Sequence, residues 1–124
     1  MRSLSLKLFL IYLLVLFSLF IVGNANGQSL KLGDDLTVVH FNAGWNSANN
    51  VKWVNNLNDI KVKKCDIAVD TKSASKHEII VVPTIIIFNH GKEIKRYQAD
   101  ISFSIKATRS QIQSKIDDIL MESF

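Results

Sequence analysis

The chain has 124 residues, of which 48% are apolar, and a formal net charge of +4 at pH 7. Its first 25 residues contain a long apolar run that accounts for much of this hydrophobicity. The remaining 99 residues carry 13 Lys or Arg against 11 Asp or Glu, so this part is close to neutral. It lacks the basic stripe that binds nucleic acid, and its length suits one small domain.

The N-terminal segment has the pattern of a secretory signal peptide. Arg2 and Lys7 precede residues 8–22 (LFLIYLLVLFSLFIV), and residues 23–25 (GNA) follow with small residues at the positions that a signal peptidase reads. We expect cleavage after residue 25, or else two residues later, and an exported protein, periplasmic or extracellular. The alternative is a membrane anchor formed by residues 4–22, although the apolar run itself, residues 8–22, has fifteen residues and falls short of the ~20 that span a bilayer.

The mature part begins with a short polar lead-in, residues 26–35, before the domain at residues 36–124. Residues 36–42 (LTVVHFN) are rich in β-branched and apolar side chains and predict a buried strand. After a turn, apolar side chains at helical spacing predict a helix over residues 48–57, with Ser47 as its cap. A second strand is expected at residues 62–69, parallel to the first because a helical crossover joins them.

The second half predicts a helix or turn at residues 72–78 and a very apolar segment, residues 79–88, that contains Pro83. Residues 89–92 (NHGK) predict a hairpin turn, and the charged residues 93–97 an edge strand.

Beyond the hairpin, Ile101, Phe103 and Ile105 alternate and are expected to hold an extended segment on the core, or to form an interface with a partner subunit. Thr108 and Gln111 have the spacing of a capping box for a last helix. Its apolar stripe consists of Ile112, Ile116, Ile119 and Leu120. The order of elements predicts an α/β sandwich.

Two segments resemble the thioredoxin family. Phe41 to Asn49 (FNAGWNSAN), directly after an apolar strand, is similar to the F-x-A-x-W-C-x-x-C signature of thioredoxins. Val82-Pro83-Thr84, ahead of an apolar run and a glycine hairpin, is similar to the segment in which a cis-proline precedes a buried strand. The resemblance covers about residues 36–121. It implies a thioredoxin-like sandwich with a trimmed four- to five-stranded mixed sheet flanked by helices, in which Leu30 and Leu32 are candidates for a fifth strand fragment.

The chain departs from the family at the residues that carry the chemistry. Asn46 and Asn49 stand where the resemblance implies the two redox cysteines, and neither can form a thiolate or a disulfide. His40 stands where the family often has a buried acid. Because dithiol exchange needs an attacking and a resolving thiol, the site is expected to have lost its redox role.

The resemblance implies a groove for an extended or partly unfolded polypeptide beside Trp45. We therefore expect a redox-inactive polypeptide-binding module that uses Trp45, Asn46, Asn49, Val82 and Pro83, with the backbone of Val82 pairing with the partner strand. A membrane is a partner only if the leader is retained, and no cofactor is expected.

Cys65, the single cysteine of the chain, leaves an alternative function open. Beside Ile67 and Val69 on one face of the second strand, it is expected to be buried and inert. If the thiol were exposed, Lys63 and Lys64 would lower its pKa, and the protein would be a monothiol oxidoreductase of the thioredoxin family.

The three histidines, His40, His77 and His90, lie far apart in the sequence. No pair has the spacing of metal ligands, so no metal site is predicted, and His90 is interpreted as a turn residue.

Overall fold

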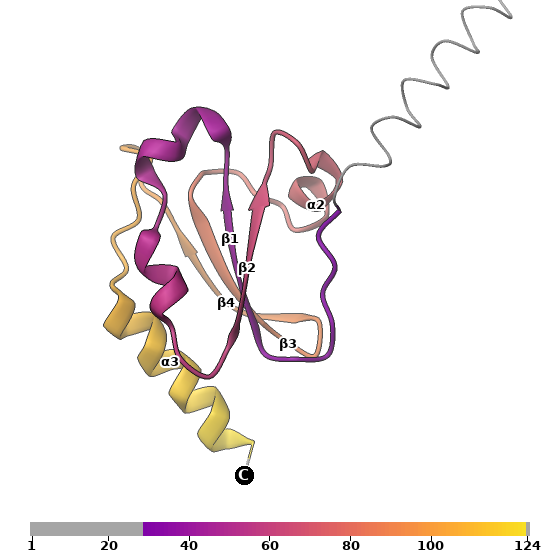
Figure 1. The fold of residues 1–124 in the computed structure, drawn as a ribbon, viewed down its shortest axis with the longest axis vertical. Coiled ribbons are helices and arrows are strands. Elements are labelled where there is room, and N and C mark those ends of the chain that lie inside the picture. Colours follow the sequence, from indigo (N-terminus) through magenta and orange to yellow (C-terminus); the bar gives the residue numbers. More distant parts are fainter. Residues whose placement is uncertain (1–28, 124) are drawn as a thin grey trace, which may run out of the picture.

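The computed structural model describes residues 29–123, and the predicted signal segment lies outside them. In chain order the elements are β1 (Thr37–Asn42), the 3-10 helices η1 (Gly44–Asn49) and η2 (Lys52–Asn56), β2 (Lys61–Asp66), α2 (Thr71–Lys76), β3 (Thr84–Asn89), β4 (Lys92–Gln98) and α3 (Arg109–Glu122). Together they form the predicted α/β sandwich (Figure 1).

The sheet of the described residues has four strands in the order β2-β1-β3-β4. β1 and β2 are parallel, as predicted, and the other two pairs are antiparallel. His90 and Gly91 join β3 to β4 with φ angles of 53° and 75°, the left-handed conformation that a two-residue hairpin turn needs. The predicted hairpin and the predicted mixed sheet are therefore confirmed.

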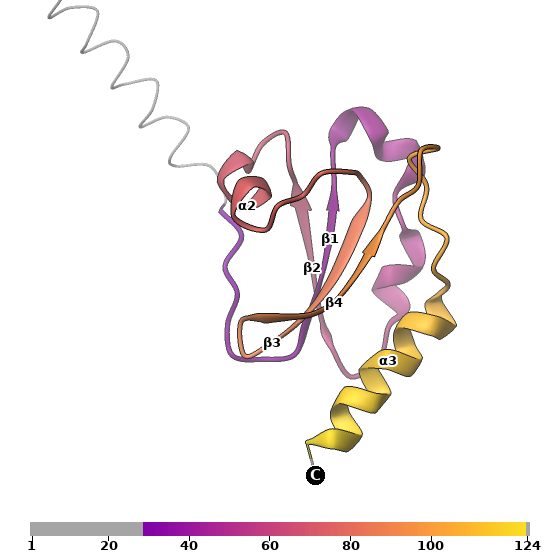
Figure 2. The ribbon, with the colours of Figure 1, turned by 180° about the vertical axis from the view of Figure 1, so that it is seen from behind.

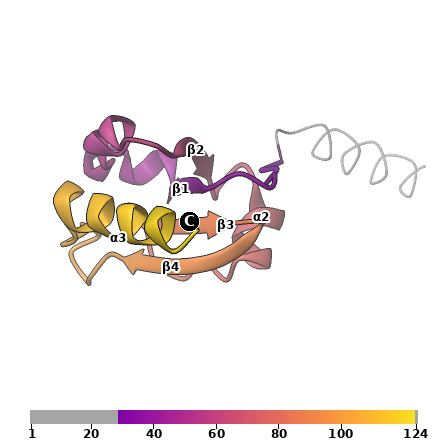
Figure 3. The ribbon, with the colours of Figure 1, turned by 90° about the horizontal axis from the view of Figure 1, so that it is seen from below.

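Each face of the sheet buries its own apolar cluster. The 3-10 helices and α3 lie on one side of the sheet and α2 on the other, as Figures 2 and 3 show from two further directions. The cluster under the 3-10 helices and α3 consists of Val38, Val51, Val54, Leu57, Ile85, Ile87, Ile112, Ile116 and Ile119. The opposite cluster consists of Val39, Phe41, Cys65, Ile86 and Phe88.

The prediction of one helix over residues 48–57 was wrong. The chain forms two short 3-10 helices instead, because Asn50 and Val51 between them leave helical geometry. Two side chains of β1 form hydrogen bonds with the residues at this break. Val51 N–H donates to His40 Nε2 at 3.3 Å, and the Asn42 amide nitrogen donates to Asn50 Oδ1 at 2.5 Å. The predicted Ser47 cap is absent, since η1 begins after Ala43 without a side-chain cap.

The second strand ends at Asp66 and does not reach residue 69. A turn follows, in which the carbonyl of Asp66 accepts from the N–H groups of Val69 and Asp70, and its carboxylate accepts from that of Ala68. Val69 is exposed as a result, so the prediction that it shares a buried face with Cys65 was wrong.

The lead-in and the segment after β4 also differ from their predictions. Leu30 and Leu32 pack on the sheet face that holds Phe41 but form no strand. Ile101 is 99% exposed, whereas Ile105 packs against the opposite core, so only part of residues 101–105 lies on the core. The predicted capping box of α3 is confirmed, because Thr108 and Gln111 exchange both hydrogen bonds.

Candidate functional site

Three segments meet beyond the carboxyl end of β1. η1 follows that strand directly, residues 82–83 lead into β3 with a cis Val82–Pro83 peptide bond, and the turn at residues 100–104 follows β4. The first two segments carry the motifs that the sequence analysis singled out. The third contributes Phe103, a contact that sequence reasoning missed because it depends on an irregular turn.

Asn46 connects these three segments through its side-chain amide. Its nitrogen donates to Asn42 Oδ1 at 3.1 Å, and at 3.4 Å to the carbonyl oxygens of Val82 and Phe103. Its oxygen accepts from the amide of Asn49 at 2.8 Å. The Asn46 side chain is only 5% exposed, so it is a buried and fully hydrogen-bonded group where the family resemblance implied a thiol.

Asn42 completes the network from the end of β1. Its amide nitrogen donates to the carbonyl of Asn46 at 3.1 Å as well as to the side chain of Asn50. The network ties the end of β1 to the middle and the C-terminal end of η1. None of these amide groups is nucleophilic or titratable near neutral pH, and their hydrogen bonds hold the chain in position.

Trp45 and Phe103 form an aromatic pair on the surface of this site. Their ring centroids lie 5.6 Å apart with an interplanar angle of 86°, an edge-to-face contact. Trp45 is 68% exposed and Phe103 is 46% exposed. Phe103 has a left-handed φ of 59°, and its N–H donates to the carbonyl of Asp100 within the turn. The turn therefore holds an aromatic side chain against Trp45.

The other residues predicted to bind a polypeptide lie deeper. The side chains of Val82 and Pro83 are buried, and the carbonyl of Val82 already accepts from Asn46. Asn49 is half-buried beside the network. The structure thus brings all five predicted residues into one region, and their role in binding stays a prediction.

Cys65 lies apart from this site, in the cluster on the other face of the sheet. Burial, with Asp70 next to it, raises the pKa of the thiol to about 12. The sulfur lies 3.8 Å from Asp70 Oδ2, to which it donates. A thiol with this pKa stays protonated near neutral pH, so the structure does not provide the thiolate that a nucleophilic cysteine needs.

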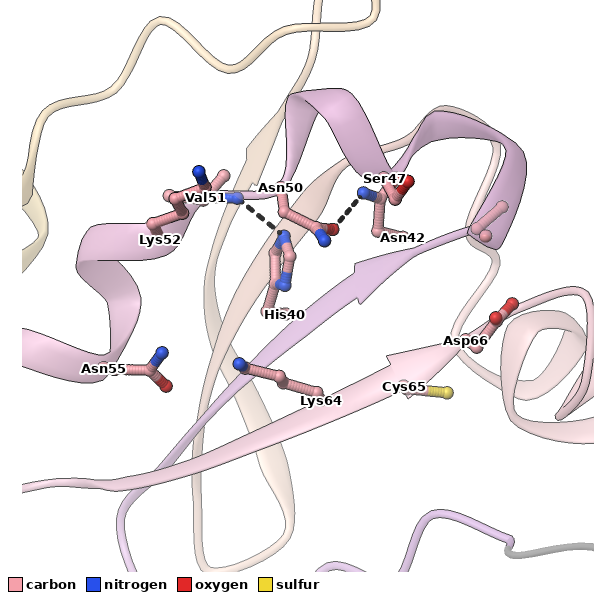
Figure 4. Close-up of a pocket in the computed structure, with 12 residues that line it drawn as sticks. His40, Asn42, Ser47, Asn50, Val51, Lys52, Asn55, Lys64, Cys65 and Asp66 are labelled. Carbon is pink, nitrogen blue, oxygen red and sulfur yellow. Dashed lines mark hydrogen bonds between the residues drawn. The ribbon is translucent and has the colours of Figure 1, made fainter.

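His40 lies on the other side of the Asn42 network, beneath the break between η1 and η2. It is 4% exposed, and burial, with a smaller contribution from Lys64, lowers its pKa to about 4. The imidazole is therefore neutral near pH 7, and it accepts from Val51 N–H through Nε2 (Figure 4). It borders a cavity that lies between β1, β2 and the 3-10 helices.

Residues 29–123 have neither a group of side chains suited to a metal ion nor a helix suited to a membrane. This part of the chain contains no cluster of three or more His, Cys, Asp or Glu side chains suited to a metal ion. Of the helices in the same residues, none has the length and apolar character needed to cross a bilayer.

Comparison with known proteins identifies the class to which this architecture belongs. The thioredoxin family model matches residues 24–117. The fold is similar to thioredoxin from Trypanosoma brucei brucei, with a TM-score of 0.54 and 24% identity over 72% of this chain and 78% of that chain. It is also similar to thioredoxin 1 from the thermophilic eubacterium Thermosipho africanus, with a TM-score of 0.53 and 18% identity over 70% and 97% of the two chains.

A third similar structure is Fasciola hepatica thioredoxin, with a TM-score of 0.50 and 20% identity over 82% of this chain and 89% of that chain. No match was found among curated proteins. Because the family model covers most of the chain, the protein belongs to the thioredoxin family, and the resemblance in the sequence is confirmed. It is a member with a single cysteine, Cys65.

The Asn46 network predicts a clear loss of stability on truncation. Asn46→Ala leaves the side-chain oxygen of the buried Asn42 and the side-chain nitrogen of the half-buried Asn49 without these partners, and we expect the free energy of unfolding to fall by about 2–3 kcal/mol in denaturant titrations. Asn56→Ala is the matched control, because Asn56 is exposed in η2, and it should change this free energy by less than about 0.5 kcal/mol. Equal effects of the two substitutions would contradict a structural role for Asn46.

The low pKa of His40 predicts a loss of stability in mild acid. In the unfolded chain the imidazole has its ordinary pKa of 6.5, so between pH 6.5 and about 4 the unfolded state binds the proton first. The contribution of His40 to the free energy of unfolding is therefore complete above pH 6.5 and is lost as the pH falls towards 4. The total loss is at most about 3 kcal/mol.

Unfolding free energies at pH 4.5 and 7.5 should therefore differ less in His40→Gln than in the parent protein. His77, whose pKa burial also lowers, contributes in both proteins and cancels in this comparison. An NMR titration of the His40 ring gives an independent measurement, and a pKa near 6.5 in the folded protein would contradict the prediction.

Proposed function

We propose that the protein is a redox-inactive polypeptide-binding member of the thioredoxin family that acts outside the cytosol. The observation that carries the proposal is the exposed pair of Trp45 and Phe103 beside the buried network of Asn46. The site has kept an accessible apolar surface and lacks thiols. Export rests on the sequence of the N-terminal segment, which lies outside the described residues.

The aromatic pair is suited to an apolar side chain of an extended partner. Large rings bury much area at a low cost in conformational entropy, and Trp is enriched among residues that dominate binding energies. The contact between the rings and the turn that contains Phe103 hold both side chains in place before binding. This arrangement lowers the entropic cost of binding.

Asn49 supplies the polar contact to the backbone of the partner polypeptide. Its amide nitrogen donates to Asn46, whereas its side-chain oxygen has no hydrogen-bond donor within residues 29–123. This oxygen lies on a half-buried residue of η1, beside Asn46, and can accept from a partner N–H. Pairing through Val82 is less favourable than the sequence suggested, because a partner would share the carbonyl with Asn46.

The alternative function, a monothiol oxidoreductase, has weaker support. Attack on a disulfide requires a thiolate at an accessible position, whereas Cys65 is buried with a raised pKa. The thiol also belongs to the apolar cluster on the sheet face opposite to α3, and it is not part of the surface formed by Trp45 and Phe103.

Binding can be tested with an unfolded, carboxymethylated polypeptide as the probe. We expect weak saturable binding in fluorescence anisotropy, and an increase in the dissociation constant of at least about fivefold in Trp45→Ala and in Phe103→Ala. Met121→Ala is the control, because it truncates an exposed apolar residue on α3. Unchanged binding in both aromatic variants would exclude this surface as the binding site.

Redox inactivity can be tested by a disulfide-reduction assay driven by dithiothreitol. We expect the protein and Cys65→Ala to give the same background rate, and Cys65 of the folded protein to be alkylated slowly because the thiol is buried and protonated. Turnover that disappears in Cys65→Ala would instead establish the monothiol function.

A further inference from the structure

A cavity of about 280 Å³ opens beside the proposed polypeptide site, between the 3-10 helices and the neighbouring strands β1 and β2. It does not include the aromatic pair. Most of its lining side chains are polar, and Figure 4 shows them arranged around the ring of His40. Its volume is several times the ~30 Å³ share of one water molecule in the liquid, so it has room for a small ligand.

Strand register brings His40 and Lys64 to the same wall of this cavity. The two residues are directly paired in the parallel register of β1 and β2, and paired positions of neighbouring strands project to the same face. That face is the one covered by η1 and η2, since Val38 on β1 packs against Val51 and Val54 there. Both residues line the cavity.

The hydrogen bond from Val51 determines which nitrogen of His40 carries the proton. Nε2 accepts from Val51 N–H, so in the neutral ring the hydrogen is on Nδ1. Within residues 29–123 this Nδ1–H makes no hydrogen bond, yet the same residues contain no fully buried side-chain nitrogen or oxygen without a partner. The Nδ1–H group of a 96% buried residue therefore opens onto the cavity as a fixed donor.

The charges around the cavity favour an anion. Lys52 and Lys64 line it, and in the described part of the chain neither forms an ion pair with a carboxylate. Asp66 is the acidic residue of the lining. It lies at the end near Gly44, where its carboxylate accepts from Ala68 N–H. The lining thus has one net positive charge, and amide groups of Asn50 and Asn55 add further hydrogen-bonding capacity.

We infer that this cavity binds a small oxyanion, a carboxylate or a phosphate, held by the Nδ1–H of His40 and the ammonium group of Lys64. The buried N–H supplies a directed donor, and the lysine supplies the charge that offsets the cost of removing an anion from water. The inference goes beyond the proposed function and does not depend on it, because neither Trp45 nor Phe103 lines the cavity.

The test is an NMR titration of the protein with sodium phosphate and, separately, with sodium acetate, against sodium chloride at matched ionic strength and constant pH. We expect saturable shifts of the Val51 amide, the Asn55 side chain and the His40 ring with at least one of the two oxyanions. Saturation by only one of them identifies the class of ligand. No saturable shift with either, or the same shifts with chloride, would overturn the inference.

Charge-matched variants separate this site from general attraction to a basic protein. Lys64→Gln should weaken binding at least tenfold, whereas Lys72→Gln, an exposed lysine on α2, should leave it unchanged. His40→Gln tests the fixed donor, and because Lys64 is exposed, its variant remains informative if His40→Gln does not fold. Equal binding by the parent and Lys64→Gln would overturn the inference. Trp45→Ala separates the two proposals, because it should weaken polypeptide binding and leave oxyanion binding unchanged.

Discussion

The buried amide of Asn46 is the interaction on which the rest of the site depends. It donates to β1 and to two segments that lie 36 and 57 residues further along the chain, and it accepts from Asn49. A buried amide is costly unless its donors and acceptor are satisfied. The segments that satisfy Asn46 are the ones that bring Trp45 and Phe103 together. A position that implied redox chemistry in the family resemblance has become the structural centre of an exposed aromatic surface.

The same principle explains the irregular chain after β1. β1 is buried along its whole length yet carries the polar side chains of His40 and Asn42. Each of these side chains has a hydrogen-bond partner at the break between η1 and η2: His40 accepts from Val51 N–H, and Asn42 donates to Asn50. A continuous helix would use Val51 N–H for a backbone bond, so tertiary hydrogen bonds override the local preference for a helix. The cavity lies at this break.

Features set by local sequence signals were predictable, and features set by distant contacts were not. The hairpin at His90 and the capping box at Thr108 follow from neighbouring residues, and the parallel strand pair follows from the general rule for crossover connections; the structure confirms all three. The helix over residues 48–57 was wrong because apolar spacing contains no information on the polar partners in β1. Neither the contact of Phe103 with Trp45 nor the cavity at His40 was anticipated, because each depends on how distant segments are placed in space.

The division between core and site explains how the family fold tolerates these changes. Asn46 is the buried residue of η1, and Val54 is that of η2. The apolar clusters draw on the strands, on η2 with its flanking residues Val51 and Leu57, and on α3, whereas no residue of η1 belongs to either cluster. Substitutions within η1 therefore alter the chemistry of the site without removing an apolar contact of the core. What they must preserve is hydrogen bonding at one buried position, and an asparagine with partners from three segments meets that requirement without a thiol.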